Sequence, residues 1–281
     1  MSPVQEQPEG EMRWNGAAYD PIGINLVGWT RISVRFFGAL VLFVVFVPVA
    51  ALARLSRLYA AQAWLLKIGS RGMLSLLGLK LEVEGSADKA TSGFVANHAS
   101  WLDIFVLYSA VPGQFVAKAD VSKWPGIGMM GRLMGTIFIE RKTAQARDHL
   151  DLLRARLDQG ERLIFFPEGT STDGQRILPF RTTLFEAFMD QDHIGQTALQ
   201  SVYVQYKPDA RYDPRIYSLY GDIPVLDSML NVLSMGKTGR AVVRFGPIRS
   251  VSDYPNRKML ASILEADTRA LADPQIASRS A

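Results

Sequence analysis

Apolar and polar positions follow two different patterns on either side of about residue 80. Before it, long apolar stretches suit helices, whereas after it short apolar runs alternate with segments of helical periodicity. The short runs are rich in β-branched and aromatic residues, a composition typical of strands. They predict strands at residues 80–84, 93–96, 114–117, 136–140, 162–166, 198–206 and 241–245. The helical periodicity predicts helices at residues 101–109, 125–134, 143–159, 184–189, 227–234 and 257–272.

Alternating strands and helices predict an α/β sheet domain. In such domains ligands collect at the carboxyl ends of strands, so residues that follow a strand are the first candidates for a site. The length of 281 residues fits one sizeable domain with an appendage. We expect a polar N-terminal tail at 1–25, hydrophobic helices at 26–79, the main domain at 80–273 and a C-terminal tail at 274–281.

The N-terminal region carries the strongest hydrophobic signal. Residues 36–53 contain no charge and are flanked by two arginines on each side. A signal peptide would start nearer the N-terminus and end at a small-residue cleavage site, and this segment does neither. The segment is at the short limit for a membrane-spanning helix, and Pro48 interrupts it. Apolar stretches follow at 58–66 and 73–79, so the region predicts a helical hairpin that anchors in one leaflet. A single transmembrane span and a pair of buried soluble helices are the alternatives.

Charge and composition narrow the function classes. The net charge of +4 is compatible with an anionic membrane surface or a phosphorylated substrate. Nucleic-acid binding is not expected, because no basic run is interleaved with aromatic residues. The absence of cysteine excludes disulfides, cysteine metal ligands and a thiolate acyl-enzyme. With three histidines and no HExxH motif, no metal site is expected.

The segment NHASWLD at 97–103 offers a histidine–carboxylate pair. Histidine is the commonest general base, and a carboxylate on its far ring nitrogen fixes the tautomer and stabilises the imidazolium. On a continuous helix the five-residue offset between His98 and Asp103 would point them apart. However, residues 93–96 indicate a strand, and Ser100-x-x-Asp103 resembles a capping box that starts a helix. His98 would then lie in the turn, with Asp103 reaching back toward it. Asp103 acting only as a helix cap is the alternative.

A second polar segment, FPEGT at 166–170, follows a predicted strand. Gly169 lets the backbone approach a ligand closely, and Glu168 and Thr170 offer polar groups. An ordinary loop with a solvated glutamate is the alternative. The serine that follows lacks the closing glycine of a nucleophile elbow, so a covalent serine mechanism is not supported.

Taken together, these motifs resemble those of the glycerolipid (PlsC-like) acyltransferase family, typified by bacterial 1-acylglycerol-3-phosphate acyltransferases. NHASWLD is similar to the first family motif, GTIFIER at 135–141 to the second, and FPEGT to the third. Their order and spacing agree with the family over roughly residues 75–245. The resemblance implies a glycerol-3-phosphate acyltransferase-like α/β fold, a mixed sheet flanked by helices, with a hydrophobic N-terminal hairpin.

The resemblance also implies site roles. His98 would deprotonate a lysolipid hydroxyl and Asp103 would orient it, after which the alkoxide would attack an acyl thioester directly. The remaining implied residues would bind substrate: Lys118, Arg141, Glu168, Gly169, Thr170 and Arg181. No cofactor is implied. The acyl co-substrate would be a thioester of acyl carrier protein (acyl-ACP) or of coenzyme A (acyl-CoA). The bilayer and the lysolipid acceptor are the other expected partners. The expected location is a bacterial inner membrane, with the main domain on its cytoplasmic side.

One departure from the family concerns the acceptor. The third motif usually continues FPEGTRS, and Ser171 stands in the arginine position. Arg176 or Arg181 could compensate, or the acceptor could carry a different headgroup. The main prediction is acyl transfer to 1-acyl-sn-glycerol-3-phosphate in phospholipid biosynthesis. The form of residues 166–181 looks like the lyso-ornithine lipid acyltransferase branch, so ornithine lipid synthesis, with one enzyme accepting both lipids, is the alternative. A noncatalytic lipid-binding protein and a lipid hydrolase are remoter alternatives.

Overall fold

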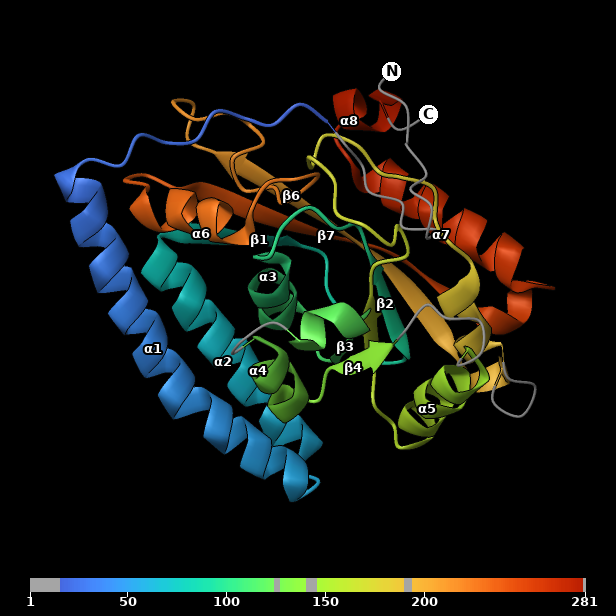
Figure 1. Cartoon of the computed structure of the whole chain (residues 1–281). Coiled ribbons are helices and arrows are strands. Elements are labelled where there is room, and N and C mark those ends of the chain that lie inside the picture. The colour runs from blue at the N-terminus through green and yellow to red at the C-terminus, as the bar shows by residue number, and fades with distance from the viewer. Residues whose placement is uncertain (1–15, 124–126, 140–145, 190–193, 280–281) are drawn as a thin grey trace.

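The computed structural model describes residues 16–123, 127–139, 146–189 and 194–279. Within these ranges one sheet has the strand order β1-β7-β6-β2-β5-β3-β4 (Figure 1). Its strands are β1 (Leu79–Glu84), β2 (Gly93–Ala96), β3 (Gln114–Lys118), β4 (Ile137–Ile139), β5 (Leu163–Phe165), β6 (Ala198–Pro208) and β7 (Gly239–Ser250). Every predicted strand is therefore present, with ends that differ by up to five residues.

The sheet is mixed, as predicted for this fold class. Strands β6, β2, β5, β3 and β4 are parallel to one another, β7 is antiparallel to β6, and β1 is parallel to β7. A register irregularity between Gln200 and Val202 bends the long β6–β7 pair. The carboxyl ends of β2, β5, β3 and β4 meet at one edge of the sheet, which places the residues that follow β2, β5 and β3 side by side.

Side chains alternate between two apolar cores, one on each face of the sheet. Phe94 and Ala96 of β2 belong to one core and Val95 to the other, as the two-residue period of a strand requires. Helices α2 (Tyr59–Leu77), α3 (Asp103–Ala110) and α6 (Val225–Ser234) contribute to the first core. Helices α5 (Ala146–Asp158) and α7 (Arg257–Leu271) contribute to the second, on the other side of the sheet in Figure 1.

The helix predictions differ from the structure in detail. The segment predicted at 184–189 is a 3₁₀ helix, η3 (Thr183–Phe188), instead of an α-helix. Helix α4 (Ile127–Met134) occupies the described part of the prediction at 125–134. Two shorter 3₁₀ segments, η1 (Ala119–Lys123) and η5 (Val251–Asp253), follow β3 and β7. A short helix, α8 (Pro274–Arg279), lies in the segment expected to be a tail.

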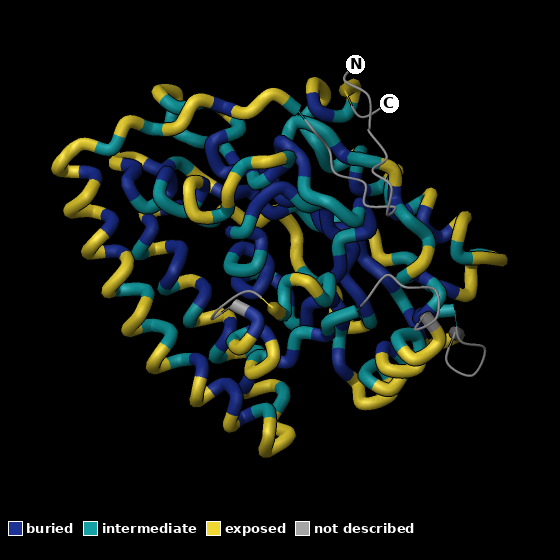
Figure 2. Tube along the Cα trace, viewed as in Figure 1, coloured by how far each residue is buried: buried dark blue, intermediate teal, exposed yellow. Residues whose placement is uncertain are grey.

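The N-terminal helices α1 (Leu26–Leu55) and α2 form the predicted hairpin. One face of α1 packs on α2, while the outer face is exposed and apolar (Figure 2), with Val34, Phe37, Val41 and Val44 each more than 60% exposed. By length and composition α1 could cross a membrane. It is attached to the main domain near both ends. The guanidinium of Arg35 donates to the carbonyls of Val232 and Met235, and that of Arg54 pairs with Glu161 at 3.0 Å.

Candidate active site

The loop between β2 and α3 brings the predicted histidine and aspartate into contact. Nδ1 of His98 lies 2.7 Å from Oδ2 of Asp103. The backbone N–H groups of Ala99 and Ser100 donate to the same oxygen at 2.9 and 3.0 Å. Helix α3 begins at Asp103 itself, with Leu102 as its N-cap and no side-chain capping bond, so the predicted capping box is not formed. The carboxylate of Asp103 therefore contacts both the backbone of the turn before α3 and the imidazole.

The other oxygen of Asp103 has a partner that sequence reasoning missed. The hydroxyl of Tyr206, on β6, donates to Oδ1 at 2.6 Å. Burial and the neighbouring carboxylate raise the pKa of Tyr206 well above its usual value, so the hydroxyl remains a donor at neutral pH. Asp103 itself is fully buried. Four donors thus hold an aspartate that has no access to water, and its second oxygen is fixed toward His98.

The imidazole of His98 stacks on an aromatic ring and is partly open to solvent. Its side chain is 29% exposed. The ring of Phe166 stacks on it at a centroid distance of 4.1 Å, and Phe115 stacks on Phe166 in turn. With Nδ1 donating to Asp103, Nε2 carries the lone pair in the neutral ring. The geometry therefore presents a nitrogen base at the carboxyl edge of the sheet.

Glu168 lies beside His98, but its carboxylate contacts backbone. Oε1 accepts from the N–H of His98 at 2.8 Å, and Oε2 accepts from the N–H of Leu178 at 2.7 Å. Burial raises the pKa of Glu168 to about 8, because loss of hydration outweighs the two hydrogen bonds that favour the charged form. The N–H of Thr172 also donates to the carbonyl of His98. The FPEGT loop therefore fixes the backbone that carries the base.

Replacing Glu168 by glutamine is expected to destabilise the fold. The side-chain amide has one oxygen in place of two, so one of the two backbone N–H groups loses its acceptor. Such a loss costs about 1–3 kcal/mol of unfolding free energy. Chemical denaturation measures the change, with the more exposed Glu186→Gln as control. A role in substrate binding alone would instead raise KM and leave unfolding unchanged.

Those of the other predicted substrate-binding residues that the structure describes lie around this edge. Lys118 ends β3 and pairs in register with Ile139, the last residue of β4. Arg141 lies outside the described residues, two positions beyond β4. Gly169 has a φ of 72°, the left-handed conformation that glycine adopts without strain, and Thr170 follows it. The N–H of Arg181 donates to the carbonyl of Pro167 at 2.9 Å, which places Arg181 beside the same loop.

Two side chains are relevant to the arginine that usually follows FPEGT in the family and that this chain lacks. The hydroxyl of Ser171 donates to the carbonyl of Leu219. The guanidinium of Arg176, one of the two candidates for compensation, donates to both carboxylate oxygens of Asp173 at 3.2 Å. Across the described ranges, no three His, Asp or Glu side chains group as metal ligands would.

The contact between His98 and Asp103 gives the site a histidine that an aspartate orients. Such a pair can remove a proton from a hydroxyl group.

Comparison with known proteins agrees with this chemistry. The acyltransferase family model matches residues 81–205. A lyso-ornithine lipid O-acyltransferase of Rhodobacter capsulatus is 42% identical over 196 residues, covering 70% of this chain and 71% of that protein. One from Rhizobium meliloti is 31% identical and covers 91% and 90%. A 1-acyl-sn-glycerol-3-phosphate acyltransferase of Neisseria meningitidis serogroup B is 30% identical and covers 78% and 92%.

A solved structure shares the fold. The crystal structure of the 1-acyl-sn-glycerophosphate acyltransferase PlsC from Thermotoga maritima matches with a TM-score of 0.63 and 19% identity, covering 86% of this chain and 94% of that one. The predicted fold and family resemblance are both confirmed. Of the two predicted acceptors, the similarities favour the alternative, lyso-ornithine lipid, over the main prediction. The chain belongs to the PlsC-like acyltransferase family and is a lysolipid O-acyltransferase.

Proposed function

We propose that the protein transfers a fatty acyl group from a thioester to the free hydroxyl of lyso-ornithine lipid, with lysophosphatidate as a poorer acceptor. Ser171 carries the proposal. It replaces the arginine that the family motif usually places after FPEGT, and its hydroxyl donates to a backbone carbonyl. An arginine fork is well suited to a phosphate, and a serine used in this way is not. The relatives from Rhodobacter and Rhizobium, both lyso-ornithine lipid O-acyltransferases, support the same acceptor.

The reaction needs one base and correct placement of two substrates. Nε2 of His98 takes the proton of the acceptor hydroxyl as its oxygen attacks the thioester carbonyl carbon. Asp103 stabilises the imidazolium that forms. The tetrahedral intermediate then collapses, the carbon–sulfur bond breaks, and the departing thiolate takes the proton from the imidazolium. Because a thioester is already activated, no acyl-enzyme is required.

We infer that the hairpin holds this chemistry at a membrane surface. Arg35 and Arg54 are separated by about 28 Å along α1, given 1.5 Å per residue. Both contact the main domain. If α1 crossed the bilayer, the main domain would have to cross with it. We therefore favour α1 lying along one leaflet with its exposed apolar face in the acyl region. Acyl thioesters are cytoplasmic metabolites, which supports the cytoplasmic side of a bacterial inner membrane as the location.

This arrangement is consistent with a simple division of the chain. Residues 26–79 are proposed as the anchor and residues 80–273 as the catalytic domain, between the terminal segments 1–25 and 274–281.

The acceptor is tested by offering lyso-ornithine lipid and lysophosphatidate to the purified enzyme side by side, with acyl-ACP and acyl-CoA as donors. We expect kcat/KM for lyso-ornithine lipid to be higher by about tenfold or more, the worth of one charged hydrogen-bond pair to phosphate. Product is measured by mass spectrometry. Equal or greater efficiency with lysophosphatidate would overturn the proposed acceptor while leaving the acyl-transfer activity intact.

A further inference from the structure

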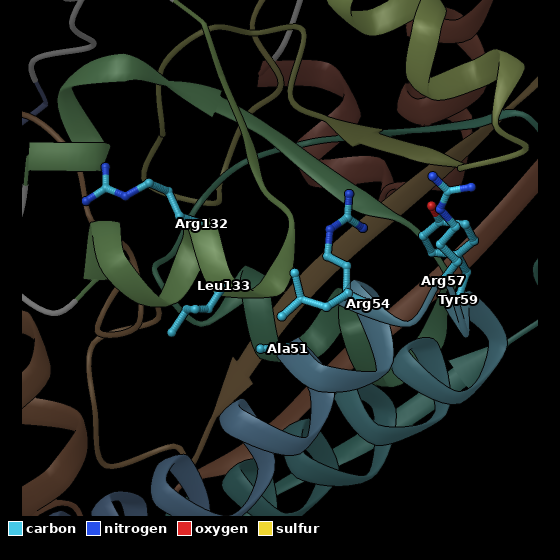
Figure 3. Close-up of a pocket in the computed structure, with 7 residues that line it drawn as sticks. Ala51, Arg54, Arg57, Tyr59, Arg132 and Leu133 are labelled. Carbon is cyan, nitrogen blue, oxygen red and sulfur yellow. The ribbon is translucent and has the colours of Figure 1, made fainter.

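A pocket of about 340 Å³ opens at the turn of the α1–α2 hairpin (Figure 3). It is separate from the catalytic loop. Arg54 on its wall pairs with Glu161, which precedes β5, and the amide of Gln62 donates to the carbonyl of Met134 just before β4. These contacts lie where the strands begin, whereas His98 follows the end of β2. The pocket and the base therefore occupy opposite edges of the sheet.

The pocket carries unbalanced positive charge. Arg54, Arg57 and Arg132 all contribute to its lining. Glu161 accepts from Arg54 and also from Arg156, so this one carboxylate is shared by two arginines. Among the described residues, Arg57 and Arg132 have no acidic partner; Arg132 donates only to the carbonyl of Ser122. In Figure 3 Arg54 lies between them, at the end of α1.

Arg57 occupies a backbone position that suits glycine. The N–H of Leu58 donates to the carbonyl of Ala53, and the N–H of Arg57 to that of Arg54, which closes the end of α1. Arg57 has a φ of 58°, and it is the one described residue other than glycine with a positive φ. Helices often end with glycine in this conformation because a Cβ is unfavourable there. An arginine at this position costs stability relative to glycine, which points to a use for its side chain.

The surroundings indicate what that use is. Two exposed apolar side chains line the pocket, Leu55 at 82% and Leu133 at 43% exposure. Leu55 is the last residue of α1, whose outer face is also exposed and apolar. Guanidinium groups next to apolar side chains match the boundary between phosphates and acyl chains in a bilayer. We propose that this pocket binds the phosphate of an anionic phospholipid headgroup, and so fixes how the hairpin sits on the membrane.

The test uses the purified full chain and vesicles of phosphatidylcholine with and without phosphatidylglycerol. Arg57→Gly is expected to weaken binding to the anionic vesicles about fivefold, the usual contribution of one basic residue near an anionic surface. Binding to neutral vesicles should be unchanged. The variant should unfold at the same temperature as the wild type or higher, because glycine relieves the strain at this position. Lys258→Gln, which removes one exposed charge from α7, is the matched control and should retain binding.

Two results would overturn this assignment. The first is that Arg57→Gly binds anionic vesicles as tightly as the wild type, or that it loses the same amount of affinity for both kinds of vesicle. The second concerns free phosphate as the ligand. If inorganic phosphate raised the unfolding temperature of the wild type more than chloride at equal ionic strength, and Arg57→Gly removed the effect, the pocket would bind soluble phosphate instead of lipid. Acyl transfer to detergent-dispersed acceptor should be unchanged in Arg57→Gly, which separates this test from that of the proposed reaction.

Discussion

Replacing His98 by alanine is expected to abolish acyl transfer, with kcat/KM reduced by about 10²–10⁴-fold or more. The substitution removes the nitrogen that we propose takes the hydroxyl proton. It leaves the backbone N–H of His98 to donate to Glu168 and its carbonyl to accept from Thr172. The fold should therefore survive the loss of the side chain. Product formation by the purified variant measures the effect, and circular dichroism checks the fold.

His149→Ala is the matched control, because His149 lies on α5, on the other side of the sheet from α3. It should leave activity within about twofold of the wild type, as expected of a side chain outside the site. An active, folded His98→Ala enzyme would contradict the role of His98.

Replacing Asp103 by asparagine is expected to lower kcat by roughly 10²–10⁴-fold without unfolding the protein. The amide oxygen can still accept from the N–H groups of Ala99 and Ser100. The amide nitrogen can donate to the hydroxyl of Tyr206, which reverses its role. The negative charge that we propose stabilises the imidazolium is lost. Steady-state kinetics, together with thermal unfolding of the same preparation, measures the two consequences.

Asp103→Ala provides the comparison. It removes the acceptor of two backbone N–H groups and of the Tyr206 hydroxyl, so it should lose stability as well as activity. If the asparagine variant turned over like the wild type, Asp103 would only hold the turn before α3 in place.

Most strands could be predicted because each is a short apolar run between turn residues. Residues 93–96 were predicted with their observed ends, and this strand is buried on both faces. The sequence pattern predicts only residues 241–245 of strand β7. It extends to Ser250 because pairing with β6 supplies hydrogen-bond partners that no local pattern reveals. Tertiary pairing outweighs local preference there.

The candidate site also combines local contacts, which the sequence predicts, with long-range contacts, which it does not. The contact of His98 with Asp103 spans five residues and depends on a local turn, so spacing and a capping pattern indicated it. Tyr206 reaches Asp103 from 103 positions away, and only the placement of β6 next to β2 brings it there. Glu168 was recognised from its motif, but its hydrogen bond to the N–H of His98 depends on the pairing of β2 with β5. Long-range contacts of this kind leave no periodicity in a single sequence.

The central claim is that His98 activates an acceptor hydroxyl, and thiol release from an acyl thioester tests it most directly. The purified enzyme is incubated with acyl-ACP or acyl-CoA, with and without lyso-ornithine lipid, and free thiol is followed over time. We predict rapid thiol release that requires the acceptor and matches ester formation one for one, and that is lost in His98→Ala. Release of thiol at the same rate without acceptor would show a hydrolase and contradict the claim.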